Sequence, residues 1–380
     1  MQKIKRSNWS SNFTLVGQPV IQDWTFKMDA VNANGNWCYN TLSLDVDCGD
    51  KHGTVRAEMM GGYSTDPSRE SIIYAHGKKD NGDDDFKNSI KVAWDDRFND
   101  DILAEIGDLS FIVVGIEKTT KGDIFKKYFL SEYDAIAYIQ KHLTSDMVIR
   151  VNGVLEYSEY KGQVQVRKKI NEIVLSKIDS RDKYYARFVQ SFLLDSESAT
   201  KDCIDKSTGI MTVNARVLDY VKMVGDVEYK GQYPYNICVD FEMPMNNEAQ
   251  CKALLDKVFK VKRGVTQMTW QGDFIENGAT VKTTVDDVPD EIKELIGITF
   301  EEDEVLATCA TNGNKVRRMV LRKPHIKLVG ENKTPTLQKF EEQYTEEELI
   351  LDIAPAATED DEELPFDMDE NVGNDYSWLS

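Results

Sequence analysis

Aromatic residues interleaved with Lys and Arg are the feature of this sequence with the clearest chemistry. Two stretches carry it, Glu117–Phe129 (EKTTKGDIFKKYF) and Tyr157–Lys169 (YSEYKGQVQVRKK). Proteins hold single-stranded nucleic acids with cations on the phosphates and aromatic faces on the bases. The pattern therefore predicts a strand-binding surface. The residues that we assign to it are Trp37, Tyr39, Lys118, Lys121, Lys126, Tyr128, Tyr157, Tyr160, Lys161, Arg167, Lys169 and Arg187.

The period-2 alternation of a strand indicates which of these side chains point outward. In Tyr157–Lys169 it directs Val166 inward and Arg167 outward. Tyr157 has the parity of a core residue and reaches the surface only if a bulge near Gly153 shifts the strand. The alternative is that these residues form solvated strand faces over core aromatics.

Signals for catalysis are weak. There is no phosphate-cradling GxxxxGK[ST] and no GxSxG, and the four His and six Cys lack the spacing of a zinc site. Carboxylates cluster at Asp80–Phe86 (DNGDDDF) and Trp94–Asp101 (WDDRFNDD), which a two-metal nuclease could use. A solvated loop is the favoured interpretation of this hydrophilic stretch. We therefore predict no enzyme, no metal and no cofactor.

The acidic residues are concentrated at the C-terminal end. The chain has 66 Asp and Glu against 46 Lys and Arg, a net charge of −20, and fifteen of the acids lie after Lys339 with no base among them. Such a single-sign block predicts a disordered interaction tail. It contains DDEELPF (Asp360–Phe366), an apolar group behind acids. The residues that we assign to partner binding are Asp361, Glu362, Glu363, Leu364, Pro365, Phe366 and Trp378.

The sequence also indicates the cellular compartment in which the protein is expected. The first residues, MQKIKRSNWS, lack the apolar region of a secretory signal, and no run approaches the ~18 apolar residues of a membrane span. The six Cys are scattered without a CxxC, which is typical of reduced thiols. A cytoplasmic protein is expected.

The pattern of elements predicts a mainly β fold. Alternation marks strands at Thr41–Cys48 and Gly53–Met60, and apolar periodicity marks helices at Tyr133–Leu143 and Asn247–Phe259. Each helix is followed by a strand that contains a glycine, Gly153 or Gly272, and then by a hairpin. One architectural unit is therefore used twice.

Three strands, a helix and a two-stranded hairpin is the order of the OB-fold, a five-stranded Greek-key barrel. We expect two such barrels in tandem. The first covers residues 1–178, with an insertion around 63–99. The second covers 179–335 and ends in a helical and extended appendage from Pro289 to Gly330, and the disordered tail covers 336–380.

An acidic tail on an OB-fold body resembles the bacterial single-stranded DNA-binding proteins, whose acidic tip ends in Asp-Ile-Pro-Phe. Leu364, Pro365 and Phe366 correspond to the apolar part of that tip. In that family Phe is the last residue, whereas DMDENVGNDYSWLS follows it here. The resemblance implies that the tail recruits replication or repair proteins.

The body is similar to single-stranded DNA-binding proteins of DNA replication and recombination that are encoded by tailed phages. The segments that carry this resemblance include NWCYNTLSLDVDCG, GDLSFIVVGIEKTTKG, LSEYDAIAYI, VNGVLEYSEYKGQVQVRKKINEIVLSK and NGNKVRRMVLRKPHIK. It implies sequence-tolerant binding of single strands and no catalytic centre. The alternatives are an acidic DNA mimic that inhibits a host nucleic-acid enzyme and an all-β virion protein, with a nuclease last.

Overall fold

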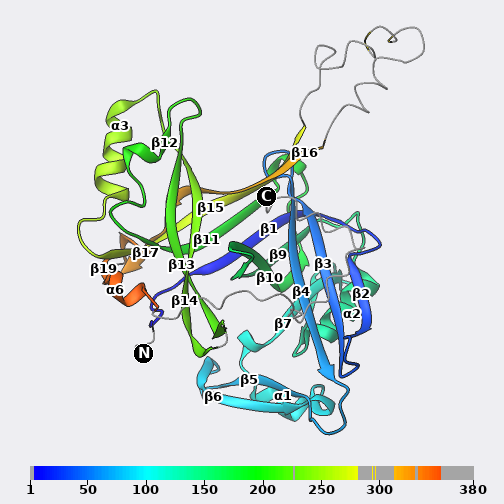
Figure 1. Ribbon diagram of the computed structural model, residues 1–380. Helices are drawn as coiled ribbons and strands as arrows, with labels where there is room; N and C mark the ends of the chain where they lie inside the picture. The colour runs from blue at the N-terminus through cyan, green and yellow to red at the C-terminus, as the bar shows by residue number, and fades with distance from the viewer. Residues whose placement is uncertain are drawn as a thin grey trace.

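The computed structural model describes residues 4–225, 227–280, 312–329 and 333–351, together with Lys293 and Ile296 (Figure 1). All seven tail residues assigned to partner binding lie outside these residues. Among the described residues, no helix is long and apolar enough to cross a membrane.

The first barrel is closed by five strands. They are β1 (Ser11–Val20), β3 (Trp37–Asp47), β4 (Thr54–Ser64), β9 (Ile149–Tyr160) and β10 (Gln163–Leu175). β1 pairs with β3 and β9, β3 pairs with β4, and β9 pairs with β10. A parallel contact between β10 and β4 at Lys169 and Glu58 completes the ring. This is the strand order of the OB-fold.

A helix lies between the third and fourth strands of this barrel, as that fold requires. α2 (Glu132–His142) begins where the Ser131 side chain accepts a hydrogen bond from the Tyr133 N–H. Acids in its first turn and basic residues in its last complement the helix dipole. Ile136 and Ile139 are fully buried in the barrel core. The predicted helix is confirmed.

The second barrel repeats the arrangement. Its strands are β11 (Tyr185–Leu194), β13 (Ile210–Val224), β14 (Val227–Glu242), β15 (Val265–Thr280) and β16 (Asn312–Pro324). β11 pairs with β13 and β15, β13 with β14, and β15 with β16, while β14 and β16 are parallel. α3 (Glu248–Ala253) and the π-helical turn η5 (Leu254–Phe259) occupy the place of α2. The predicted mainly β fold with two OB-type barrels is confirmed.

One part of the predicted second barrel is wrong. The fifth strand, β16, comes from the segment that was assigned to an appendage, and it pairs with β15 along most of its length. The short hairpin expected after the strand that contains Gly272 is also wrong, because β15 continues to Thr280 and pairs with β16, with Gly278 opposite Lys315. The pattern missed β16 because the two strands are 31 residues apart in the chain.

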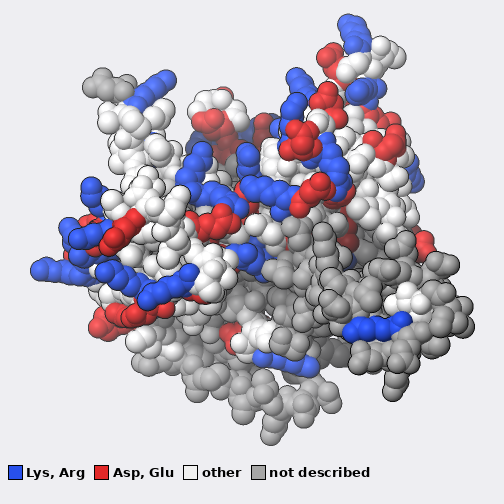
Figure 2. Space-filling model, turned by 90° about the horizontal axis from the view of Figure 1, so that it is seen from above, with Lys and Arg blue, Asp and Glu red and all other residues white. Residues whose placement is uncertain are grey.

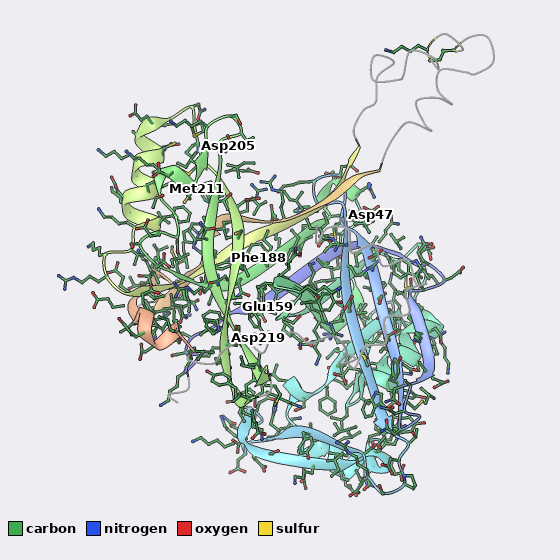
Figure 3. The ribbon with its side chains drawn as sticks, viewed as in Figure 1. Asp47, Glu159, Phe188, Asp205, Met211 and Asp219 are labelled. Atoms are coloured by element: carbon green, nitrogen blue, oxygen red, sulfur yellow. The ribbon has the colours of Figure 1, made fainter. Side chains whose placement is uncertain are left out.

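The two barrels join through their first strands. β1 and β11 pair antiparallel, with Phe13 directly opposite Phe188. Each ring packs on a glycine of its own barrel, so that a Cβ would lie 2.7 Å from the Phe13 ring at Gly153 and 2.1 Å from the Phe188 ring at Gly272. Phe188 consequently lies at the centre of the molecule, between the barrels (Figure 3). The matching positions of the two glycines support the predicted repeat.

The insertion in the first barrel is a folded element, whereas a solvated loop was expected. It contains the hairpin β5 (Ile72–Lys78) and β6 (Asp84–Ala93), the turn η1 (Trp94–Asp96), α1 (Asp100–Glu105) and the turn η2 (Asp108–Ser110). A small core of Ala75, Val92, Ile106 and Leu130 holds it together. Beyond it, β7 (Ile112–Lys118) and β8 (Ile124–Phe129) extend the barrel sheet from β10.

The smaller elements complete the molecule. They are β2 (Phe26–Val31), η3 (Arg181–Lys183), η4 (Lys201–Cys203), β12 (Ile204–Asp205), β17 (Ile326–Val329), β18 (Thr334–Leu337), β19 (Lys339–Tyr344) and α6 (Glu346–Leu349).

Regular elements continue beyond residue 336, where the tail was predicted to begin. β19 pairs with β15, and Tyr344 and Leu349 are buried against Ile4 and Val265. The sequence analysis missed these elements because the acids of α6 mask two short apolar contacts. Ten acids and no bases follow Leu351, which leaves 56 acids against 46 bases, a net of −10, in residues 1–351.

Candidate nucleic-acid interface

Barrels of this topology bind oligonucleotides on the face of their second and third strands, between the loops that follow strands one and four. In the first barrel this face is formed by β3 and β4 and is bordered by the β9–β10 turn. Its outward side chains form ion pairs across the strands, Arg56 Nε to Asp45 at 2.9 Å and Arg167 Nε to Glu58 at 3.2 Å. Trp24 lies against the Arg56 guanidinium, 4.4 Å from the ring centroid.

Three of the predicted phosphate contacts are already paired with acids. Arg167 contacts Glu58 and Glu156, Lys169 contacts Glu132 at 3.6 Å and Glu156 at 3.9 Å, and Lys126 contacts Glu172 at 3.3 Å. Such part-exposed pairs are worth roughly 0–1 kcal/mol, so a phosphate can replace the carboxylate. The neighbouring acids still lower the local positive potential.

Two of the predicted stacking residues are buried, and their assignment to the surface is wrong. Tyr157 is 5 % exposed and Tyr39 is 7 % exposed. The register irregularity near Gly153 lies on the partner strand, between Ile170 and Glu172, so Tyr157 keeps the core parity that alternation gave it. Their residue type suggested stacking on bases, but both side chains point into the core and cannot contact a bound strand.

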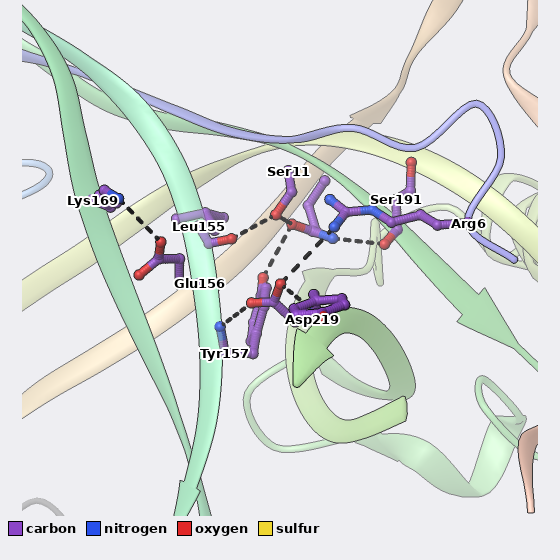
Figure 4. A network of polar contacts seen from close by, with 10 residues as sticks. Arg6, Ser11, Leu155, Glu156, Tyr157, Lys169, Ser191 and Asp219 are labelled. Atoms are coloured by element: carbon purple, nitrogen blue, oxygen red, sulfur yellow. Dashed lines mark hydrogen bonds and ion pairs between the residues drawn. The ribbon is translucent and has the colours of Figure 1, made fainter. Parts of the chain in front are cut away.

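Tyr157 instead belongs to a polar network between the barrels (Figure 4). Its hydroxyl donates to Gln190 Oε1 at 3.1 Å, and its N–H donates to Asp219 Oδ2 at 2.6 Å. Ser11 Oγ also donates to Gln190 Oε1, and Arg6 lies 3.9 Å from Asp219. Burial raises the pKa of both Tyr157 and Asp219. The network fixes the first barrel against β13 of the second.

A second set of charged contacts joins the first barrel to β15 of the second. Lys168 Nζ lies 2.8 Å from Glu276, and both side chains are less than 10 % exposed. Lys51 and Arg322 contact Asp273 at 2.7 and 2.8 Å. Burial alone would raise the pKa of Asp273, but hydrogen bonds from these two cations outweigh it and lower that pKa. The barrels are thus held in one fixed arrangement.

The β7–β8 hairpin does bring several predicted residues together at the surface. Lys118 and Lys121 are exposed, and Tyr128 is 56 % exposed. Phe125, which is 44 % exposed, has Lys127 Nζ 5.9 Å from its ring centroid. This hairpin therefore presents rings and cations on a single element.

The remaining predicted residues lie on three further elements. At the β9–β10 turn, Lys161 has a φ of 49° and its Nζ lies 5.2 Å from the Tyr160 ring. Arg187 of β11 is exposed and stacks on Tyr185 at 4.3 Å. Trp37 is half-buried where β3 begins.

Sequence reasoning missed the rings of the insertion. Six Phe and Tyr side chains are exposed among the described residues, and three of them, Tyr74, Phe86 and Phe98, belong to the insertion. Tyr74 is 67 % and Phe86 69 % exposed, and Lys91 Nζ lies 5.9 Å from the Tyr74 ring. The signal was present in IIYAHGKK and DDFKNSIKVA, where aromatic residues again alternate with Lys. The acidic residues between these two segments instead favoured the interpretation as a solvated loop.

One carboxylate of the insertion, that of Asp84, forms local contacts. Asp84 Oδ1 accepts the Leu109 N–H at 3.0 Å and lies 3.5 Å from His76 Nε2. In the described part of the chain, no group of three or more His, Cys, Asp and Glu is placed to hold a metal ion.

A comparison with models of protein families identifies the family of this chain. The model of the family named YorF matches residues 76–297, more than half of the chain. The chain belongs to the YorF family. The matched region includes most of the insertion and four of the five strands of the second barrel, β11 to β15.

Other comparisons add little for this YorF-family protein. No curated protein matches it. Two crystal structures of the single-stranded DNA binding protein from Thermus aquaticus are similar, the wild type at 11 % identity and a TM-score of 0.29, and a deletion mutant at 10 % and 0.30. Each likeness covers 71 % of this chain, and 87 % and 88 % of the other chain respectively. Scores this low carry no argument, so the barrel assignment rests on strand pairing.

Proposed function

We propose that this protein binds single-stranded DNA without sequence preference and has no catalytic centre. The observation that supports this most is the set of aromatic rings with an adjacent cation on the surface of two OB-type barrels. These ring–cation pairs are Tyr74–Lys91, Phe125–Lys127, Tyr160–Lys161 and Tyr185–Arg187, with the cation 4.3–5.9 Å from the ring centroid.

The pairs match the requirements of a single strand. Stacking of a base on an aromatic ring contributes about 1–3 kcal/mol and tolerates every base, and the adjacent cation neutralises a phosphate. Residues 1–351 carry a net charge of −10, which disfavours general attraction to duplex DNA. Binding therefore depends on the rings, which a paired duplex does not admit.

We infer that the tail after Leu351 recruits proteins of DNA replication or recombination in the cytoplasm, the host cytoplasm if the protein is phage-encoded. Its ten acids steer it toward a basic partner. Leu364, Pro365 and Phe366 supply apolar side chains for a small pocket. No base within the tail opposes that attraction.

The test is fluorescence anisotropy with a labelled oligo-dT and a matched duplex over a salt titration. The proteins are the full chain, a chain ending at Leu351, and Tyr74→Ala/Phe125→Ala/Tyr128→Ala. A truncation at Lys339 is unsuitable because it removes most of β19 and all of α6. Leu109→Ala is the matched control, since Leu109 is 72 % exposed in the same insertion but has no ring.

Loss of three stacking contacts should weaken binding of the single strand by at least ~100-fold, at about 1 kcal/mol or more per ring. The control and the Leu351 chain should bind as the full chain does, or tighter. If the full chain binds no single strand at low salt, the proposal is wrong, and a DNA mimic or a virion protein becomes the better hypothesis.

A further inference from the structure

A cluster of exposed cations extends from the end of α3 through η5 to the residues before β15. Its members are Lys252, Lys257, Lys260, Lys262 and Arg263. All five are exposed, and Asp256 is the only acid within these twelve residues. In the described part of the chain, none of the five forms an ion pair. We call this group the α3 cation cluster.

The corresponding helix of the first barrel shows that the cluster is not a property of the fold. Both acids of α2 are paired, Asp134 with Arg97 at 2.7 Å and Glu132 with Lys169 at 3.6 Å, and His142 lies beside an acid of β7 at 3.2 Å. Lys141 is the one lysine of α2, and it has no ion-pair partner among the described residues. Within the described residues, the same position in the two repeats therefore carries one unpaired cation in the first barrel and five in the second.

The backbone that presents the cluster is unusual and well anchored. Lys257 lies in the π-helical turn η5, a conformation that is rare and frequently found at functional sites. Phe259 at its end is buried and stacks on Trp270, with centroids 5.0 Å apart and planes 14° apart. The cations therefore project from a fixed support.

β19 adjoins the cluster without adding to its net charge. Lys339 donates to the carbonyls of Val258 and Lys260 at 3.5 Å, and Glu341 lies 3.6 Å from Lys339 Nζ and offsets its charge. Figure 2 shows several Lys and Arg side chains projecting at the left of the molecule, the side on which α3 lies in Figure 1, with some Asp and Glu beside them.

The residue types in the cluster indicate the kind of ligand that it can bind. Phe259 is the only aromatic residue from Asn247 to Gly264, and it is 2 % exposed, so no ring is offered to a base. Lysine heads spaced along a surface bind phosphates without reading sequence. We propose that the α3 cation cluster binds the phosphodiester backbone of nucleic acid, at a site separate from the ring–cation pairs.

This inference rests on the proposed function and extends it. A site that uses only phosphates accepts single and double strands alike, whereas the rings accept only unpaired bases. The protein would thus hold a single strand through the rings while the cluster contacts a further length of the same strand or an adjoining duplex.

The test compares two full-length variants that lose the same charge. One is Lys257→Gln/Lys260→Gln/Lys262→Gln/Arg263→Gln. The control is Lys201→Gln/Lys206→Gln/Lys222→Gln/Lys230→Gln, four exposed lysines of the same barrel. Anisotropy is measured over a salt titration with oligo-dT and with an oligo-dT that adjoins a duplex. Thermal unfolding verifies that both variants fold.

If the cluster makes about three phosphate contacts, the slope of log K against log salt should fall by about 2, which weakens binding roughly 100-fold at low salt. The control should keep the slope of the unaltered protein. An equal slope in all three proteins would overturn this inference while leaving the proposed function intact, whereas failure of the unaltered protein to bind would refute both.

A chain ending at Leu351 distinguishes the other polyanion available, the protein's own acidic tail. If the effect of the four substitutions disappears when the tail is removed, the cluster binds the tail and not nucleic acid, and the inference is wrong. If the effect persists, nucleic acid is the ligand.

Discussion

The buried pair of Lys168 and Glu276 gives the sharpest test of how the two barrels are held together. Each side chain is less than 10 % exposed, and their charged atoms are 2.8 Å apart, with Arg317 at 3.6 Å from the same carboxylate. Lys168→Met leaves that carboxylate buried with Arg317 as its main partner. Removal of one member of a buried pair costs about 3–5 kcal/mol. We expect a value near the lower end because Arg317 remains.

The assay is equilibrium unfolding in urea, followed by both circular dichroism and tryptophan fluorescence. Lys168→Met should lower the free energy of unfolding by about 3 kcal/mol. Lys168→Met/Glu276→Leu should recover most of that loss, because it removes both buried charges, and Arg317, which loses the carboxylate, is 28 % exposed and can be solvated. Arg167→Gln is the control, since its part-exposed pairs are worth roughly 0–1 kcal/mol.

A loss below 1 kcal/mol in Lys168→Met, or a double variant as unstable as the sum of the two single variants, would refute this reasoning. The two signals should also change together, because the buried charges join the barrels into one cooperative unit. Separate transitions would show that the barrels unfold independently.

Two further predictions concern the same interface. In Gly272→Ala the new Cβ would lie 2.1 Å from the Phe188 ring, so the protein should lose about 1–3 kcal/mol of stability or more in urea unfolding, and Phe188→Leu in the same chain should restore part of it. The pKa of Asp273 is lowered from 3.8 in the folded state, so the carboxylate stabilises the fold above pH 3.8, and this contribution is lost as the pH falls through the lower folded value. Asp273→Asn should therefore show a smaller loss of stability between pH 5 and 3 than the unaltered protein, and an identical pH profile would contradict the assignment.

The sequence predicted those parts of the fold whose signals are local. The apolar periodicity of Tyr133–Leu143 found α2 within a residue at each end, because packing and capping both favour a helix there. The repeat was recognisable from Gly153 and Gly272, since each must leave room for a phenylalanine ring. β16 was missed because its pairing with β15 depends on contact across a long connection, which turn chemistry does not encode.

The candidate site was less predictable, because residue type does not fix side-chain direction. Tyr39 and Tyr157 suggested stacking but lie in the core. Lys169 and Arg167 suggested phosphate contacts but face acids from other elements, α2 and β4, which a single sequence cannot place beside them. The exposed ring of Tyr74 could have been found from its alternation with Lys in the insertion.

The pairing of β1 with β11 has a consequence for synthesis on the ribosome. Residues 11–16 of β1 hydrogen-bond to 185–190 of β11, so that edge of the first strand stays open until about half of the chain has emerged. Ile4 stays uncovered for longer, since Tyr344 and Leu349, which pack on it, lie more than 300 residues further along the chain. An open strand edge invites pairing with another chain. A nascent chain that stalls before β11 is therefore the form of this protein most exposed to aggregation.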